Sequence, residues 1–364
     1  MPKTRVLVAE DSLTVRRRLV EVLSADPDLE VVGEAEDGKR AIALCLQLRP
    51  DVITMDMMMP VMSGLGATEY LMAHCPTPIV IVSASTNRGE LFRTYDALAA
   101  GAVDVVEKPR GDETDAAWER AFASTVKLVA RIKVITHLRG RLPQLAPADL
   151  LHGNDLRSPA AQAGPGGAVA RRLVAVGAST GGPGAIVELL RGLSPQFPLP
   201  ILLVLHIGAA FGAALAEWLD GLSPLRVSLA RDGEPLPAVG DARVIVAPPE
   251  RHLRLVDGRL RLGSDAERHS CRPSVDVLFD SLSERAPETV ACLLTGMGRD
   301  GADGLLGLRR RGALTIAQDE QSSVVFGMPR EAILLGAADQ ILPIDRIAPA
   351  LIHAARRPVL GGQR

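Results

Sequence analysis

Short apolar runs alternate with amphipathic stretches in the first part of the chain. The apolar runs, at 5–9, 31–35, 52–55, 79–83 and 103–107, have the length of buried strands, and helical patterns lie between them. Strands that alternate with helices pair in parallel, and such doubly wound sheets carry their active groups at the carboxyl ends of the strands. The pattern therefore predicts a parallel α/β domain, closed by a long helix over 115–140.

The periodicity disappears between 141 and 170, where prolines and glycines punctuate the sequence. A second α/β pattern follows, with strands expected at 173–176, 201–207, 243–247, 290–294 and 313–317 and helices around 184–191, 211–221, 275–285 and 302–312. Between 251 and 263, polar and apolar residues alternate around Asp257-Gly258, which predicts a β-hairpin. The chain thus divides into an N-terminal domain (1–140), a linker (141–170), a second parallel-sheet domain (171–355) and a tail (356–364).

The composition narrows the possible partners. Lys and Arg number 41 against 43 Asp and Glu, so no general attraction to nucleic acid or to an anionic membrane is expected. The four cysteines lack C-x-x-C spacing, which predicts free thiols and neither disulfides nor a zinc cluster. Acidic residues follow the N-terminus too soon for a signal peptide, and Pro200, His206 and Gly208 interrupt the uncharged run at 199–215. A cytoplasmic protein that is not inserted in the membrane is expected.

Polar residues stand where the predicted N-terminal strands end. They are Glu10 and Asp11 after the first strand, Asp56 at the third, Ser83 at the fourth and Lys108 at the fifth, so all five project from one edge of the sheet. The three carboxylates would repel one another without a compensating cation, and Mg²⁺, held by Glu10, Asp11 and Asp56, fits. Asp56 is then a nucleophile beside a metal. Lys108 would neutralise an incoming phosphoryl group, and Ser83 would hydrogen-bond it after transfer.

This ordered set, together with Met59-Pro60, Ser83-Ala84 and Lys108-Pro109, resembles the receiver domain of response regulators over residues 4 to about 125. The resemblance implies a flavodoxin-like sheet, and it implies that Asp56 accepts phosphate from a histidine kinase. Val105 departs from the family pattern, because receivers commonly carry a switch aromatic there. Phosphoryl acceptance should survive this change, whereas the route by which the signal leaves the pocket stays open.

A glycine-rich turn, Gly177-Ala-Ser-Thr-Gly-Gly-Pro183, joins the first strand of the second domain to a helix. A nucleotide-binding loop would need a Gly-Lys-Ser/Thr ending, or a G-x-G-x-x-G fingerprint with an acidic residue after the next strand, and neither is present. The next strand ends instead in His206, which is an acid/base group. This pairing favours a serine nucleophile at Ser179, close to backbone N–H donors at the start of the helix.

The third group expected of such a site is a carboxylate at another strand end. Asp300 meets this requirement in the loop 294–301, and the backbone N–H groups of Met297 and Thr180 are candidates to stabilise an oxyanion. In a catalytic triad of this kind, Ser179 would attack an acyl carbon, His206 would act as base and then as acid, and Asp300 would orient the imidazole. Each of these residues alone is more simply a helix cap, a core histidine or a turn residue. Their shared sheet edge favours a site, although the absence of G-x-S-x-G argues against an α/β-hydrolase.

Five segments resemble the catalytic domain of chemotaxis protein-glutamate methylesterases, over about 172–352. They are Gly177-Ala-Ser-Thr-Gly-Gly182, the strand ending in His206, Arg272-Pro-Ser-Val-Asp-Val-Leu-Phe279, Thr295-Gly-Met-Gly-Arg-Asp-Gly301 and Val325-Phe-Gly-Met-Pro329. The resemblance implies a Rossmann-like domain that hydrolyses γ-glutamyl methyl esters on the cytoplasmic helices of chemoreceptors to glutamate and methanol. Some members of the family also deamidate receptor glutamines.

Further expectations follow from the resemblance. It implies Mg²⁺ for receiver phosphorylation and no cofactor for the esterase reaction. Cys271 stands where a His often precedes Arg-Pro, a change that we assign to the surface or the cleft wall. Ser274 and Asp276 could cap a core helix or help to hold the receptor helix.

The two domains suggest how activity is controlled. The linker is long enough for the first domain to cover the catalytic cleft, and a phosphoryl group on Asp56 adds about two negative charges, so phosphorylation should activate the second domain. A DNA-binding output would need a helix-turn-helix and a basic face, whereas the second half has an α/β pattern. The alternative function is a noncatalytic, phosphorylation-dependent scaffold with a vestigial triad, and labelling of Ser179 by a serine reagent would separate the two.

Overall fold

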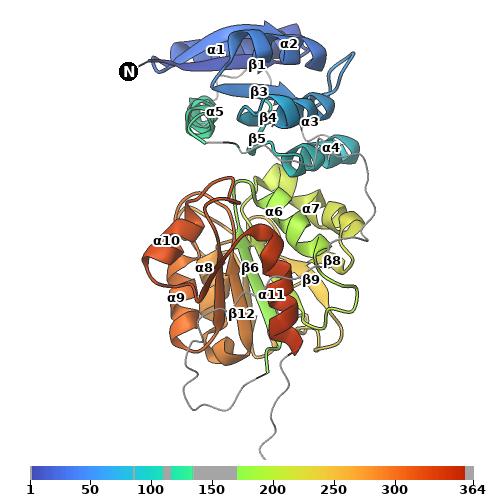
Figure 1. Ribbon diagram of the computed structural model, residues 1–364, viewed down its shortest axis with the longest axis vertical. Helices are drawn as coiled ribbons and strands as arrows, with labels where there is room; N and C mark the ends of the chain where they lie inside the picture. The colour runs from blue at the N-terminus through green and yellow to red at the C-terminus, as the bar shows by residue number, and fades with distance from the viewer. Residues whose placement is uncertain (1, 85–86, 110–115, 133, 135–169, 357–364) are drawn as a thin grey trace, which may run out of the picture.

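The computed structural model describes residues 2–84, 87–109, 116–132, 134 and 170–356. Within these ranges the chain forms two parallel sheets, each covered by helices on both faces (Figure 1). The predicted linker and tail lie outside the described residues, apart from Ala170 and Arg356.

The N-terminal sheet has the strand order β2-β1-β3-β4-β5, which is the order of flavodoxin-like folds. Its strands are β1 (Thr4–Ala9), β2 (Leu29–Ala35), β3 (Val52–Asp56), β4 (Ile79–Ser83) and β5 (Asp104–Glu107), and its helices are α1 (Leu13–Ala25), α2 (Gly38–Leu48), α3 (Gly64–His74), α4 (Arg88–Ala99) and α5 (Ala116–Val129). Helices α1 and α5 cover one face and α2, α3 and α4 the other. Because β3 and β4 are buried on both faces, their sequences are almost continuously apolar.

The C-terminal sheet is also parallel, with the strand order β14-β13-β12-β6-β7-β9-β8. Its strands are β6 (Leu173–Ala178), β7 (Ile201–Leu205), β8 (Arg226–Leu229), β9 (Arg243–Val246), β12 (Thr289–Leu293), β13 (Leu314–Gln318) and β14 (Gln340–Leu342). One face is covered by α6 (Gly182–Arg191), α7 (Ala209–Leu222) and α11 (Ile344–Arg356), and the other by α8 (Val275–Ser281), α9 (Ala302–Arg310) and α10 (Met328–Leu334). The prediction of two doubly wound parallel domains is confirmed.

The order in which the chain adds strands to the C-terminal sheet changes direction between β6 and β12, although all the strands are parallel. From β6 the chain continues to β7 on one side, whereas β12, β13 and β14 extend the sheet on the other side. Ligands of open α/β sheets bind in the crevice beyond the carboxyl ends of the strands at such a switch point. Ser179 follows β6 and the segment 294–301 follows β12, so both border this crevice.

The predicted hairpin is present, as the antiparallel pair β10 (His252–Val256) and β11 (Arg259–Gly263). Asp257 and Gly258 both have positive φ, as a two-residue hairpin turn requires. The closing helix α5 ends at Val129, earlier than predicted, and 135–140 lie outside the described residues. Strands β8 and β14 were not predicted, because they are short edge strands whose exposed residues give no apolar run.

Helix α4 joins the two domains by packing against α6 and α7 (Figure 1). Tyr95 is fully buried there, and its hydroxyl donates to the carbonyl of Phe211 in α7. The Trp218 indole N–H donates to Asp96 Oδ1 over 2.8 Å, and its ring lies 5.2 Å from that of Tyr95 between centroids. One apolar cluster therefore runs continuously from the N-terminal domain into the C-terminal domain.

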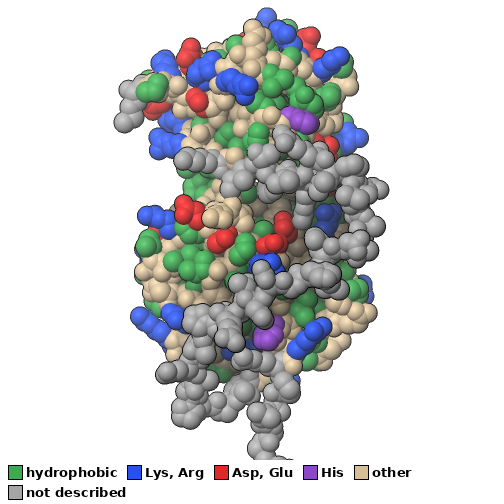
Figure 2. Space-filling model, in the orientation of Figure 1, with side chains coloured by type: hydrophobic (Ala, Val, Ile, Leu, Met, Phe, Trp, Pro, Cys, Tyr) green, Lys and Arg blue, Asp and Glu red, His purple; other side chains and the backbone are tan. Residues whose placement is uncertain are grey.

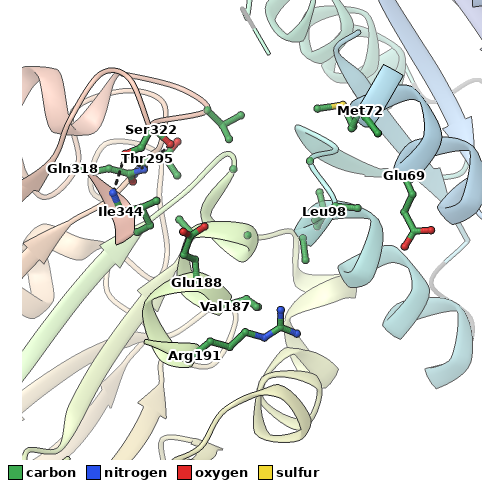
Figure 3. Close-up of a pocket in the computed structure, with 18 of the residues that line it drawn as sticks. Glu69, Met72, Leu98, Val187, Glu188, Arg191, Thr295, Gln318, Ser322 and Ile344 are labelled. Carbon is green, nitrogen blue, oxygen red and sulfur yellow. Dashed lines mark hydrogen bonds between the residues drawn. The ribbon is translucent and has the colours of Figure 1, made fainter. Parts of the chain in front are cut away.

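A cavity of about 540 Å³ lies beside this interface. Figure 3 shows Met72 and Leu98 of the N-terminal domain facing Val187 and Glu188 of α6, with Thr295 at the far end. On the face of the molecule that Figure 2 shows, basic and acidic side chains are intermingled over both domains. In the described part of the chain, no helix combines the length and the apolar character needed to cross a membrane.

Candidate active site and phosphorylation pocket

Ser179 lies at the turn between β6 and α6, where three segments meet. Its N–H donates to Thr295 O over 3.0 Å, and the N–H of Gly182 donates to its carbonyl over 2.6 Å. Gly296 allows this approach, because a Cβ at this position would lie only 2.7 Å from Ser179 Cβ. The side chain is partly exposed, and among the described residues no hydrogen bond engages its hydroxyl. A hydroxyl in this position can meet a substrate from the crevice.

His206 follows β7, the strand beside β6, and its N–H donates to Ala178 O over 3.0 Å. The structure pairs its ring with Asp300, since Nε2 lies 2.9 Å from Asp300 Oδ2. The ring is 14% exposed and the carboxylate 2% exposed, so the pair is largely buried. The ring nitrogen left for an incoming proton is therefore Nδ1.

Asp300 is held by donors from the start of α8 as well as by His206. Oδ1 accepts from the Ser274 hydroxyl over 2.8 Å and from Asp276 N–H over 3.1 Å, and Oδ2 accepts from Val275 N–H over 2.7 Å. Ser274 is also the N-cap of α8, with its Oγ accepting from Val277 N–H. A carboxylate with this many donors is fixed in orientation, and it stays ionised because the donors favour the charged form.

The pKa values of the pair follow from these contacts. Burial lowers the pKa of His206, but hydrogen bonds to Asp300 and Cys271 outweigh burial and raise it to about 9. Burial tends to raise the pKa of Asp300, yet the hydrogen bonds from His206, Ser274 and Val275 keep it below the usual value of a carboxyl group. Asp300 therefore favours the protonated imidazole that forms when His206 accepts a proton.

Two backbone N–H groups near Ser179 lack an acceptor among the described residues, namely those of Thr180 and Met297. Their positions are fixed by neighbouring contacts. The Thr295 hydroxyl donates to Thr180 O, and Gly296 accepts from Met328 N–H over 2.8 Å. Rigid, unpaired donors of this kind suit a developing negative charge on oxygen.

Cys271 contacts His206, and the sequence did not indicate this contact. Its Sγ lies 3.6 Å from His206 Nδ1, on the ring nitrogen opposite the one that Asp300 holds. The thiol is carried by a tight turn in which the backbones of Arg268 and Cys271 bond to each other and His269 and Ser270 have positive φ. Asp276 anchors this turn through His269 Nε2 at 3.1 Å. The cleft-wall interpretation of Cys271 therefore understated its contact with the imidazole.

The N-terminal domain brings Asp56, Glu10 and Lys108 together at the carboxyl edge of its sheet. Lys108 Nζ lies 2.9 Å from Asp56 Oδ1 and 3.0 Å from Glu10 Oε2. Both carboxylates are almost completely buried. Burial and the Asp56 carboxylate raise the pKa of Glu10 to about 7, and burial also raises the pKa of Asp56 against the opposing effect of Lys108. The single ammonium group of Lys108 thus neutralises only part of the negative charge that Glu10 and Asp56 carry when ionised.

The same pocket has the donor set of a magnesium site. Carboxylate oxygens of Glu10, Asp11 and Asp56 lie within 4.8 Å of one another. Both oxygens of Asp56 and Oε2 of Glu10 are buried without a hydrogen bond of good geometry in the described part of the chain. Buried oxygens left in this state are costly, and a hard divalent cation would satisfy them. The residues therefore fit Mg²⁺.

Ser83 ends β4, but its hydroxyl is directed to α4. It donates to Glu90 Oε1 over 2.8 Å and accepts from the Thr94 hydroxyl over 3.2 Å. Glu90 also accepts from Ala84 N–H over 2.8 Å, so this buried carboxylate fixes the end of β4. No sequence pattern indicated a role for Glu90, since it lies in the first turn of an amphipathic helix. Ser83 would have to leave Glu90 to reach a phosphoryl group on Asp56.

The two sheets and their strand-end residues define a two-domain α/β protein with a phosphoacceptor-type pocket in one domain and a Ser, His and Asp cluster in the other. Residues 6–116 match the family model of the response regulator receiver domain, and residues 174–351 match that of the CheB methylesterase. The chain belongs to the protein-glutamate methylesterase family of response regulators.

Relatives match along almost the whole chain. The protein-glutamate methylesterase/protein-glutamine glutaminase of Nitrosospira multiformis is 43% identical over 353 residues, covering 96% of each chain. A protein of Anaeromyxobacter dehalogenans with the same name, numbered 2, is 43% identical over 353 residues and covers 97% of each chain. The crystal structure of the Thermotoga maritima CheB methylesterase catalytic domain has 37% sequence identity and a TM-score of 0.48, covering 51% of this chain and 99% of that one.

Proposed function

We propose that this protein is a phosphorylation-activated serine esterase that hydrolyses glutamate γ-methyl esters of chemoreceptors to glutamate and methanol. The His206–Asp300 pair carries the proposal, because its carboxylate is saturated with donors and its imidazole borders the crevice beside Ser179. The relatives named as methylesterases and glutaminases support the substrate class. A receptor glutamine amide would react by the same acyl chemistry and release ammonia.

The reaction follows the general serine hydrolase scheme. Ser179 Oγ attacks the ester carbonyl carbon while His206 Nδ1 takes the hydroxyl proton, and the N–H groups of Thr180 and Met297 hydrogen-bond the resulting oxyanion. Collapse of the tetrahedral intermediate breaks the bond to the methoxy group, which leaves as methanol with the proton from Nδ1. A water molecule then attacks the acyl-serine in the same way, and this step releases the glutamate carboxylate and regenerates Ser179.

Methanol release from methylated receptor membranes tests this assignment. We expect Ser179→Ala to lower kcat at least about 10⁴-fold, since loss of a triad member commonly has this effect. Ser194→Ala, which removes a hydroxyl outside the site, should leave methanol release unchanged. Full methanol release by Ser179→Ala would refute the esterase assignment, and failure of a serine reagent to label the parent would favour a noncatalytic scaffold.

In the N-terminal domain, we assign phosphoryl acceptance to Asp56, with a histidine kinase as the donor. Asp56 Oδ1 faces Lys108, whose charge would stabilise the transferring phosphoryl oxygens. Mg²⁺ held by Glu10, Asp11 and Asp56 would supply further positive charge to these oxygens. We place the protein in the cytoplasm, at the cytoplasmic part of receptor arrays, since both proposed partners act there.

Helix α4 provides the route between the two sites. A phosphoryl group that draws Ser83 away from Glu90 and Thr94 would break two hydrogen bonds to α4. Tyr95 and Asp96 follow Thr94 directly and bind the C-terminal domain, so a shift of α4 changes the interface. This route needs no aromatic at Val105. The cavity beside the interface also reaches Gly181 and Thr295, next to Ser179, so movement of the N-terminal domain would alter access to the crevice.

Phosphodonor dependence tests this route. Asp56→Asn should abolish the increase in methanol release that a small-molecule phosphodonor produces in the parent, because it removes the nucleophilic oxygen. Asp51→Asn changes an exposed carboxylate outside the pocket and should retain the increase. Unchanged basal and stimulated release in Asp56→Asn would show that the two domains are not coupled through Asp56.

A further inference from the structure

Cys271 and His206 form a pair of donors suited to a soft metal. The thiol Sγ and the imidazole Nδ1 lie 3.6 Å apart, and both side chains are partly exposed. A Zn²⁺ ion bound at about 2.3 Å from sulfur and about 2.0 Å from nitrogen with a tetrahedral angle separates the two donors by about 3.5 Å. The observed distance of 3.6 Å is therefore close to the separation that shared coordination requires.

The environment of the imidazole completes the pattern of a zinc-binding histidine. A metal-bound histidine usually donates its second ring N–H to a carboxylate, which fixes the tautomer and strengthens the ligand. Asp300 Oδ2 provides this partner at 2.9 Å from Nε2 and is itself held by three further donors. Sγ of Cys271, a ring nitrogen of His206 and an oxygen of Asp300 all lie within 4.8 Å of one another.

The turn that carries Cys271 holds the thiol in place before any ion arrives. Its two central residues, His269 and Ser270, have φ of 52° and 59°, a region that residues other than glycine rarely adopt. The turn is fastened by His269 to Asp276 at 3.1 Å and by an ion pair between Arg268 and Asp280. The other cysteines, Cys45, Cys75 and Cys292, are buried and free of disulfides, so Cys271 is the most accessible thiol of the described residues.

We propose that Zn²⁺, or a cation of similar softness, binds Cys271 Sγ and His206 Nδ1 with water as the remaining ligands, and that it blocks the esterase reversibly. Binding displaces two protons to solvent, one from the Cys271 thiol and one from Nδ1 of the protonated His206 ring, and forms bonds from zinc to sulfur and nitrogen with no change of oxidation state. The blocking role rests on the proposed function, because a zinc-bound Nδ1 cannot take the proton of Ser179. The site itself does not depend on that function.

Binding is measured first, with Cd²⁺ as a spectroscopic probe of zinc sites that contain thiolate. We expect the full-length parent to show ultraviolet thiolate-to-cadmium absorption, and Cys271→Ser to lose it while keeping the absorption of any other cysteine. Cys271→His keeps a nitrogen ligand and should bind Zn²⁺, detected by calorimetry, without the thiolate absorption. His353→Gln, which changes an exposed histidine on α11, is the control and should behave as the parent. Equal absorption in the parent and in Cys271→Ser would overturn the site.

Inhibition is measured next, as methanol release in the presence and absence of Zn²⁺ for each variant relative to its own zinc-free rate. The zinc concentration for half inhibition should rise at least about 10-fold in Cys271→Ser, a loss of affinity of the size seen when a metal site is weakened. A chelator should restore activity, and Mg²⁺ should not inhibit. Cadmium binding at Cys271 without inhibition by Zn²⁺ would overturn the blocking role. A parent without zinc-free activity would refute the esterase proposal and leave the binding result intact.

Discussion

The two domains place a carboxylate at the same edge of similar sheets, yet they treat it in opposite ways. Asp300 is surrounded by four donors, and its pKa lies below the usual value. Glu10 and Asp56 are as deeply buried but share a single lysine, and burial raises the pKa of both. A saturated carboxylate orients a neighbour, whereas an unsaturated one attracts a cation and a phosphoryl group. The difference separates a histidine and aspartate pair of fixed orientation from a pocket whose carboxylate oxygens fit a metal ion.

Removal of the Asp300 charge is expected to have the largest effect. Asp300→Asn keeps the shape but cannot stabilise the imidazolium or its tautomer, so kcat for methanol release should fall about 10⁴-fold. The matched variant Asp303→Asn changes a carboxylate that pairs with the exposed Arg299, and it should reduce kcat by less than about twofold. Similar losses in both variants would mean that the donor cage around Asp300 has no catalytic purpose.

Proton release from His206 should dominate the pH profile. Because the pKa of His206 is about 9, only about one ring in a hundred is neutral at pH 7 and about half are neutral at pH 9, so kcat/KM should rise about 50-fold between pH 7 and pH 9. The rate of methanol release measured with Ser179→Ala at each pH gives the background rate of uncatalysed ester hydrolysis. A profile that is already flat above pH 7 would contradict the raised pKa.

The stability of the folded state should decrease as the pH rises and His206 loses its proton, whereas the activity should increase. The folded pKa of about 9 exceeds the value of 6.5 in the unfolded chain, so the protonated pair stabilises the fold fully below pH 6.5. This contribution declines as the pH rises from 6.5 to 9. Unfolding by urea at pH 6, 7.5 and 9 would reveal the loss, which Asp300→Asn should reduce.

Without metal, the N-terminal pocket should lose stability as the pH rises. Glu10 has a pKa of about 7 when folded against 4.5 when unfolded, so the unfolded chain releases its proton first and stability falls by about 3 kcal/mol between pH 4.5 and pH 7. Mg²⁺ should offset this loss because it binds the folded carboxylates, by about 2.7 kcal/mol at 100 times its Kd. Chemical denaturation with and without chelator measures both effects. A metal-free Glu10→Gln variant with the same pH slope as the parent would exclude Glu10 as the source.

The interface should give the smallest effect. Tyr95→Phe removes the donor to the buried carbonyl of Phe211, which costs about 1–3 kcal/mol when the acceptor finds no substitute. A weaker interface should raise basal methanol release a few-fold without phosphodonor. Tyr70→Phe is the control, since the Tyr70 hydroxyl makes no hydrogen bond in the described part of the chain and the residue is 41% exposed. Identical basal rates in the two variants would remove α4 from the coupling route.

The sequence by itself determined the architecture and where the chemistry would lie. Alternating apolar runs and helical patterns specify parallel sheets, and parallel strands bring their carboxyl ends to one edge whatever the loops do. Ser179, His206 and Asp300 could therefore be grouped before any distance was known, and so could Glu10, Asp11, Asp56 and Lys108. Short edge strands such as β14 show no apolar periodicity in the sequence, because few of their side chains are buried.

Only the tertiary structure decided how those residues are used. Three contacts each depend on a turn or a cap. Asp300 pairs with Nε2 of His206, Cys271 contacts Nδ1 of the same ring, and Ser83 hydrogen-bonds Glu90. Such contacts join residues 7 to 94 positions apart through single side-chain geometries that no hydrophobic period encodes. Periodicity fixes which face of an element is buried, whereas hydrogen-bond direction within a site depends on the atoms that packing brings into reach.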